Sequence, residues 1–277
     1  MKTKIYFSLA LTLLNTIVYS QSPWTQGQNK AYIQVGLSGI FYNKIRSNEQ
    51  NIDLNKSISD ITSQLYTEYG VTNNIDATII LPYKTIDVKY INNSAPESLS
   101  GFGNISIGLK YKFYDHKWKM SAGFLFSANS IKSNQIAALR TGYEAATWFP
   151  YLAVGSSNNK IYYFTTFGYG NVSNNYTDFI KTGGEFGYNF IKKTHLILNV
   201  DFKKALKTES YFDSDSNAIY SSTALYNDRQ EFNAIGIKIN HEFKTDKFGI
   251  NIGAIGAFYL NNLPAAPSFN TGIYYKL

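Results

Sequence analysis

The amino-acid sequence predicts an all-β transmembrane protein, an antiparallel β-barrel of about 12 strands. Three observations lead to this prediction. An N-terminal export signal is followed by no long apolar helix segment, apolar and polar residues alternate with a period of two, and the connections between strands alternate between short and long. Strands can cross a bilayer only as a closed barrel, because lipid offers no partner for free backbone N–H and C=O groups.

The first twenty residues have the pattern of a signal peptide. Lys2 and Lys4 supply a positive start, and an apolar stretch runs from Ile5 to Val18. Cleavage after Ser20 is expected; a single N-terminal anchor helix is the alternative. The chain is therefore expected to divide into a signal peptide (1–20), a short periplasmic N-terminal segment (21–30) and an outer-membrane β-barrel (31–277).

Composition narrows the class of protein. The chain has no Cys, so neither disulfides nor thiolate metal sites can hold it together after export. Its net charge is +7, but Lys and Arg are scattered along the chain and do not cluster on one element, so no nucleic-acid partner is expected. Aromatic residues make up 16% while the mean hydropathy is −0.23, a combination typical of alternating strands in a bilayer.

Alternation is clearest in seven segments. In Ala31 to Tyr42, for example, Val35 and Leu37 share one face, with Gln34 and Ser38 on the other. The remaining clear outward faces are Ile105, Ile107, Leu109, Tyr111 and Phe113; Met120, Ala122, Phe124 and Phe126; Leu196, Leu198, Val200 and Phe202; Ile235, Ile237 and Ile239; Phe248, Ile250, Ile252 and Ala254; and Phe269, Thr271, Ile273, Tyr275 and Leu277. Weaker strands are expected at 61–71, 75–83, 147–155, 161–169 and 180–190.

The connections set the orientation of the barrel. Short ones are predicted at 72–74, 115–117, 156–160, 192–194 and 244–247, and long polar ones at 47–57, 84–100, 130–143 and 205–230. Short turns face the periplasm in Gram-negative barrels, so both chain ends are expected there. An aromatic girdle is predicted beside these turns, formed by Tyr69, Phe113, Trp118, Phe190, Phe248 and Tyr275. Pro82 and Pro150, which each remove a ladder hydrogen bond, are expected at a rim or a bulge.

The last predicted strand ends at Leu277, with Phe269, Ile273 and Tyr275 on its outward face. This ending resembles the signal that the barrel-assembly machinery reads in Gram-negative bacteria, although Leu277 replaces the usual terminal aromatic residue. Outer-membrane lipid and that machinery are therefore the expected partners, together with a small-molecule solute.

The sequence holds little that suggests catalysis. His116, His195 and His241 lie at no spacing that would place two imidazoles together, so no metal and no cofactor are expected. Lipid-facing hydrolases with twelve strands would need a His followed two residues later by Ser; His195 and His241 lack it. A non-enzymatic protein is predicted, with such a hydrolase as the least favoured alternative.

The inward face carries most of the charges. Alternation places nine ionisable residues there, and they are the candidate pore-lining set: Glu68, Lys110, Lys112, Lys119, Lys181, Glu185, Asp201, Lys203 and Lys238. Charges inside a barrel need partners or water. Two interpretations are open, a salt-bridged interior that stiffens the wall and a narrow aqueous or ligand-binding lumen with a positive bias.

Four segments together resemble a known family: Glu68–Asn73, Leu81–Tyr83, Gly101–Ile105 and Gly108–Phe113. They are similar to the transporter-type outer-membrane barrels called meta-pathway phenol-degradation proteins. The resemblance implies a porin-like channel or transporter for small, hydrophobic or aromatic solutes. The competing hypothesis is a structural or surface-adhesion barrel that acts through its extracellular loops, above all 205–230 with Tyr211, Phe212, Tyr220 and Tyr226.

Overall fold

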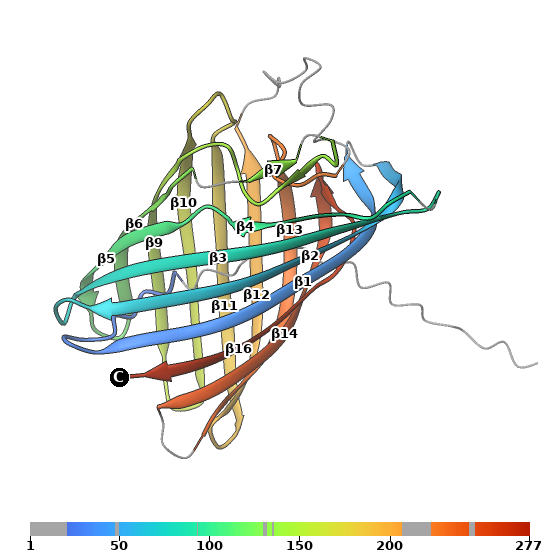
Figure 1. Ribbon diagram of the computed structural model, residues 1–277. Helices are drawn as coiled ribbons and strands as arrows, with labels where there is room; N and C mark the ends of the chain where they lie inside the picture. Colours follow the sequence, from blue (N-terminus) through green and yellow to red (C-terminus); the bar gives the residue numbers. More distant parts are fainter. Residues whose placement is uncertain are drawn as a thin grey trace, which may run out of the picture.

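The computed structural model describes residues 21–47, 50–92, 94–129, 132–134, 136–206, 223–243 and 247–277. Within them, twelve antiparallel strands close into a barrel, because β1 pairs with β2 on one side and with β16 on the other (Figure 1). The twelve wall strands are β1 (Ala31–Ser47), β2 (Gln50–Gly70), β3 (Ile75–Tyr90), β5 (Ser106–Asp115), β6 (Lys119–Ser127), β9 (Thr147–Ser157), β10 (Ile161–Val172), β11 (Phe179–Ile191), β12 (Thr194–Ala205), β13 (Glu231–Glu242), β14 (Phe248–Asn261) and β16 (Ser268–Lys276).

Four short strands complete the structure. β4 (Glu97–Phe102) extends the wall along β3 beyond the end of β5, and β15 (Leu263–Pro264) pairs with the far end of β1. β7 (Ser133–Asn134) and β8 (Leu139–Arg140) form a separate small hairpin in the connection between β6 and β9. Among the described residues, no helix is long and apolar enough to span a membrane.

The outward surface confirms the predicted alternation. Val35, Leu37, Leu109 and Ile252 are each at least half exposed, although they are apolar. Such a belt is favourable only in contact with lipid, since a soluble protein rarely exposes one large apolar surface. The barrel therefore presents to its surroundings the face of a membrane-spanning protein.

Four of the five predicted short connections, 72–74, 115–117, 156–160 and 192–194, lie together at one end of the barrel, here called the short-turn end; residues 244–246 of the fifth lie outside the described residues. β1 begins and β16 ends at this end, where Tyr32 pairs with Lys276. All six predicted girdle aromatics lie beside these turns with exposed rings. At the opposite end, called the loop end, lie the described connecting residues 128–129, 132–134, 136–146, 173–178, 223–230 and 262–267.

Two predicted long loops are wrong. Most of 47–57 and 84–100 is strand, because β1, β2 and β3 continue far beyond the membrane belt and β4 pairs with β3. Apolar and polar residues still alternate there, but the apolar residues now face the lumen. Ile86 and Val88 are fully buried inside the barrel, whereas Asp87 and Lys89 face outward. Outside the bilayer the outer face meets water, so apolar residues gain more by burial on the inside.

From the sequence we expected both prolines at a rim or a bulge, but neither of them lies at a rim. Pro82 lies inside β3, opposite the interval between β4 and β5, where one side of the ladder is open. Pro150 lies inside β9, and the pairing of β9 with β10 is interrupted between Trp148 and Tyr151. Each missing N–H therefore falls where a neighbouring strand requires no donor.

Candidate functional site: the barrel lumen

A polar cavity of ≈ 380 Å³ occupies the lumen near the short-turn end, and we call it the short-turn cavity. Amide and phenol side chains on the inward faces dominate its lining: Gln34, Gln64, Asn199, Asn240, Asn251, Asn270, Tyr32, Tyr66, Tyr162 and Tyr274. Many of them bond to one another. The Tyr32 hydroxyl donates to Gln34 Oε1 at 2.6 Å, and Asn240 Nδ2 donates to the Tyr274 hydroxyl at 3.1 Å. The cavity thus offers donors and acceptors to water or a polar solute.

Several charged side chains inside the barrel form ion pairs. Lys110 Nζ lies 3.1 Å from Glu68 Oε1 and 3.4 Å from Asp76 Oδ2, and all three residues are buried. This pairing crosses from β5 over β3 to β2, and Lys238 on β13 similarly reaches over β12 to Glu185 on β11 at 2.9 Å. The contacts of Lys110 with Glu68 and of Lys238 with Glu185 join strands that are not paired with each other. They satisfy charges that would be costly to bury alone.

The nine candidate pore-lining residues divide into three groups. Glu68, Lys110, Glu185 and Lys238 form the buried pairs near the short-turn end. Lys181, Asp201 and Lys203 lie nearer the loop end, with Lys181 Nζ 3.0 Å from Asp201 Oδ2. Lys112 and Lys119 bind Asp115 at the β5–β6 turn and line neither of the two cavities described in this section. That these residues line a conducting pore stays a prediction.

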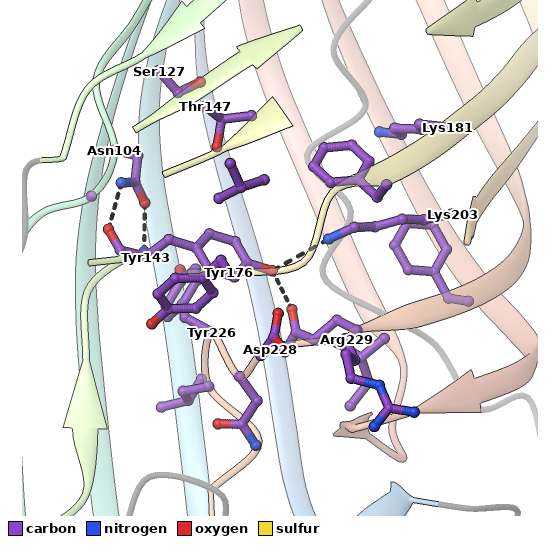
Figure 2. A pocket seen from close by; sticks show the side chains of 18 of the residues that line it. Asn104, Ser127, Tyr143, Thr147, Tyr176, Lys181, Lys203, Tyr226, Asp228 and Arg229 are labelled. Carbon is purple, nitrogen blue, oxygen red and sulfur yellow. Dashed lines mark hydrogen bonds between the residues drawn. The ribbon is translucent and has the colours of Figure 1, made fainter. Parts of the chain in front are cut away.

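A second, more apolar cavity of ≈ 270 Å³ lies toward the loop end, and we call it the loop-end cavity. Thr62 lines both cavities, so they follow each other along the lumen. Figure 2 shows Tyr143, Tyr176 and Tyr226 gathered on one side and Lys181 and Lys203 on the other. Tyr143 packs edge-on against Tyr176 and Tyr226, with ring centroids 5.7 and 5.2 Å away.

Sequence reasoning missed the aromatic lining of the loop-end cavity. Phe149 and Phe179 come from the ends of β9 and β11, and Tyr143 comes from a connection expected to lie outside the cell. A signal for Phe149 was present: it is in the inward phase between the exposed Trp148 and Leu152. An aromatic residue in that phase indicates an apolar interior.

The N-terminal segment lies inside the barrel at the short-turn end. Trp24 packs edge-on against Tyr162 and Phe164 at 6.0 and 5.8 Å. Gln26 donates its side-chain amide to Glu68 Oε2 at 2.8 Å and its backbone N–H to Asp76. Ser22 lines the short-turn cavity and Gln21 lines the loop-end cavity. The segment that we expected in the periplasm therefore narrows the lumen from within; residues 1–20, the predicted signal peptide, lie outside the described residues.

Substituting Gly70 tests this docking. A Cβ at Gly70 would lie 1.8 Å from the Gly27 carbonyl oxygen, so Gly70→Ala is expected to displace the segment. In a protein whose other tryptophans, Trp118 and Trp148, are replaced by Phe, acrylamide should then quench Trp24 fluorescence more strongly. Gly36→Ala is the control, because its Cβ would meet only ordinary contacts at 3.5 Å. Equal quenching in both variants would contradict the docking.

Described connections at the loop end fold inward. Leu139 and Leu225 are buried together with Ile58, Ile86 and other inward residues of the wall. Hydrogen bonds fix the same arrangement: Thr223 Oγ1 donates to the Ala138 carbonyl at 2.9 Å, and the Tyr143 hydroxyl donates to Gln230 Oε1 at 2.5 Å. We call residues 136–146 and 223–230 the inward loops.

No cluster of three or more His, Asp or Glu side chains suited to a metal ion occurs in the part of the chain that the structure describes. The fold and the lumen together define a closed, membrane-type β-barrel whose interior holds polar and apolar cavities in series.

Comparison with known proteins gives structural neighbours only. No family model matches the chain, and no curated protein matches it in sequence. An outer membrane channel from Pseudomonas putida F1 has a TM-score of 0.68 at 14% identity, over 90% of this chain and 96% of that chain. The translocator domain of autotransporter NalP from Neisseria meningitidis has a TM-score of 0.51 at 11% identity, covering 90% and 88%. The NanC porin has a TM-score of 0.50 at 12% identity, covering 88% and 100%. These likenesses concern the fold.

Proposed function

We propose that the protein is a non-enzymatic channel or transporter of the outer membrane that passes small solutes. The observation that carries this proposal is the pair of cavities that follow each other through the lumen of a closed barrel. A barrel with a purely structural role gains more from a filled interior, because packed side chains stabilise it and cavities do not. Two further observations support a location in the outer membrane. They are the apolar outer belt and the likeness of the fold to that of an outer membrane channel from Pseudomonas putida F1.

The lumen suits a gated path better than an open pore. The N-terminal segment narrows it at the short-turn end, and the inward loops close it at the loop end. Release of the N-terminal segment or of the inward loops from the lumen is the step that would let a solute pass. The aromatic and apolar lining of the loop-end cavity supports a solute with an apolar part, as the resemblance to the phenol-degradation barrels implies.

The adhesion alternative receives less support. Of the four loop aromatics on which it rests, Tyr226 lines the loop-end cavity, where a partner outside the cell cannot reach it. The other three, Tyr211, Phe212 and Tyr220, lie outside the described residues.

Swelling of proteoliposomes tests the channel. Vesicles that contain the purified protein should swell faster in arabinose than protein-free vesicles, whereas a large maltodextrin should give no difference. The variant Leu139→Asp, which puts a carboxylate into the contact between the inward loops and the wall, should increase the arabinose rate. If neither protein exceeds the protein-free rate, the channel is wrong.

A further inference from the structure

The loop-end cavity carries an excess of positive charge. Its charged lining consists of four cations, Lys84, Lys181, Lys203 and Arg229, and two carboxylates, Asp60 and Asp228. Lys84 pairs with Asp60 at 2.8 Å, and Lys181 pairs at 3.0 Å with Asp201, which is not part of the cavity lining. Asp228 accepts hydrogen bonds from the backbone N–H and hydroxyl of Thr177 at 2.7 and 2.8 Å. Among the described residues, neither Lys203 nor Arg229 has a carboxylate partner of its own, and Lys203 is the one that lies among the aromatic rings of the lining.

Lys203 has aromatic neighbours instead of a counterion. Its Nζ lies 4.4 Å from the ring centroid of Phe179 and 3.5 Å from the Tyr143 hydroxyl (Figure 2). No described carboxylate forms a salt bridge with it, and Glu231, on the next strand, pairs with Lys204 at 2.9 Å. Lys203 also lies directly opposite Lys181 in the β11–β12 ladder, a pairing of like charges that destabilises a sheet.

Cation–π contact does not replace the missing anion. Such a contact contributes about 0.5–2 kcal/mol, whereas removing an amine from water costs several kcal/mol even after relaxation. An ammonium group that has aromatic neighbours but no counterion is stabilised most by an anion that binds beside it. The Lys203 ammonium group can offer a carboxylate a charge-assisted hydrogen bond.

The rest of the cavity suits a small apolar body. The rings of Phe149 and Phe179 stack with centroids 5.9 Å apart and planes at 20°, and Leu125, Leu225 and Phe232 also line the space. A volume of ≈ 270 Å³ suits a molecule of about one ring.

We propose that the loop-end cavity is a binding site for a small organic carboxylate with an apolar body of about ring size, with Lys203 receiving the carboxylate. This inference deepens the proposed function and rests on it, because it names the class of solute that the channel selects. Lys203 positions the anion, and the stacked rings hold the apolar part.

Calorimetric titration of the purified, detergent-solubilised barrel with benzoate, its neutral analogue benzamide, and acetate tests the proposal. Benzoate should bind more tightly than either of the others. Lys203→Met should weaken benzoate binding by about 10- to 100-fold, as expected for the loss of one charged hydrogen-bond partner, and should leave benzamide binding unchanged. Lys203→Arg should retain most of the affinity, which separates loss of charge from loss of fold. Lys204→Met is the matched control, since this neighbouring lysine is 70% exposed and points outward.

Three outcomes would overturn the site: benzoate and benzamide binding equally, acetate binding as tightly as benzoate, or Lys203→Met binding benzoate like the native protein. The binding test and the flux test can fail independently, so their results distinguish the two proposals. Arabinose flux without benzoate binding overturns this inference and leaves the channel, whereas benzoate binding without flux of any solute overturns the channel and leaves the site.

Discussion

Replacing Leu139 with Asp is expected to open the loop end of the barrel and to raise its conductance in planar bilayers. Leu139 is fully buried where the inward loops meet Ile58, Ile86 and Leu225 of the apolar cluster. A carboxylate there has no partner in the cluster, so the docked state loses several kcal/mol relative to a state with the loops in water. A change of about 5.5 kcal/mol inverts an equilibrium from 1:99 to 99:1, so a mostly closed barrel should become mostly open.

Ile136→Asp provides the control for this prediction. It introduces the same carboxylate three residues earlier in the same connection, but Ile136 is 92% exposed and contributes nothing to the apolar cluster. Its conductance should equal that of the native protein. If Leu139→Asp and Ile136→Asp conduct alike, the inward loops do not gate the lumen.

Replacing Lys110 with Met is expected to have the largest effect on stability. Lys110 is 1% exposed and is the ion-pair partner of Glu68 and Asp76, two carboxylates that are themselves buried. Removing one partner of a buried ion pair costs about 3–5 kcal/mol, because the remaining charge stays unpaired. Urea unfolding of the barrel in lipid vesicles should show this loss of free energy of unfolding.

Lys119→Met is the matched control, on the neighbouring strand β6. Lys119 pairs with Asp115, whose side chain is 44% exposed, and exposed pairs contribute at most about 1 kcal/mol. A second substitution, Glu68→Gln, should recover part of the stability lost in Lys110→Met by removing one unpaired charge. Equal losses in Lys110→Met and Lys119→Met would show that the buried triad has no special role.

The membrane-spanning part of each strand could be predicted because lipid and lumen impose opposite polarities on alternate residues. The alternation of Ile107 and Leu109 with Lys110 in β5 is an example. The extensions of β1, β2 and β3 were read as loops because water replaces lipid there and the phase inverts, as Val88 and Lys89 show. A search for alternation that allows either phase would have found them.

The candidate site could be predicted in part. Sequence alternation placed Lys110, Glu185 and Lys238 on the inward side, but it could not predict which charges form pairs. Lys238 and Glu185 are 53 residues apart and on strands that do not pair, so their contact over β12 depends on the order of the strands in the barrel. The inward loops were missed for a related reason. Leu139 and Leu225 are apolar residues within polar connections, and their burial depends on the apolar interior that the strand extensions form.

Cysteine labelling tests the central claim, a lipid-facing wall around a lumen that contains water, most directly. The natural chain has no Cys, so the introduced cysteine is the only thiol that can be labelled in each variant. Val35 is 59% exposed on the outer wall and Gln34 lines the short-turn cavity; Leu198 and Asn199 form a second such pair. In outer-membrane vesicles a small water-soluble maleimide should label Gln34→Cys and Asn199→Cys and should spare Val35→Cys and Leu198→Cys. Labelling of the two apolar positions with protection of their neighbours would contradict this claim.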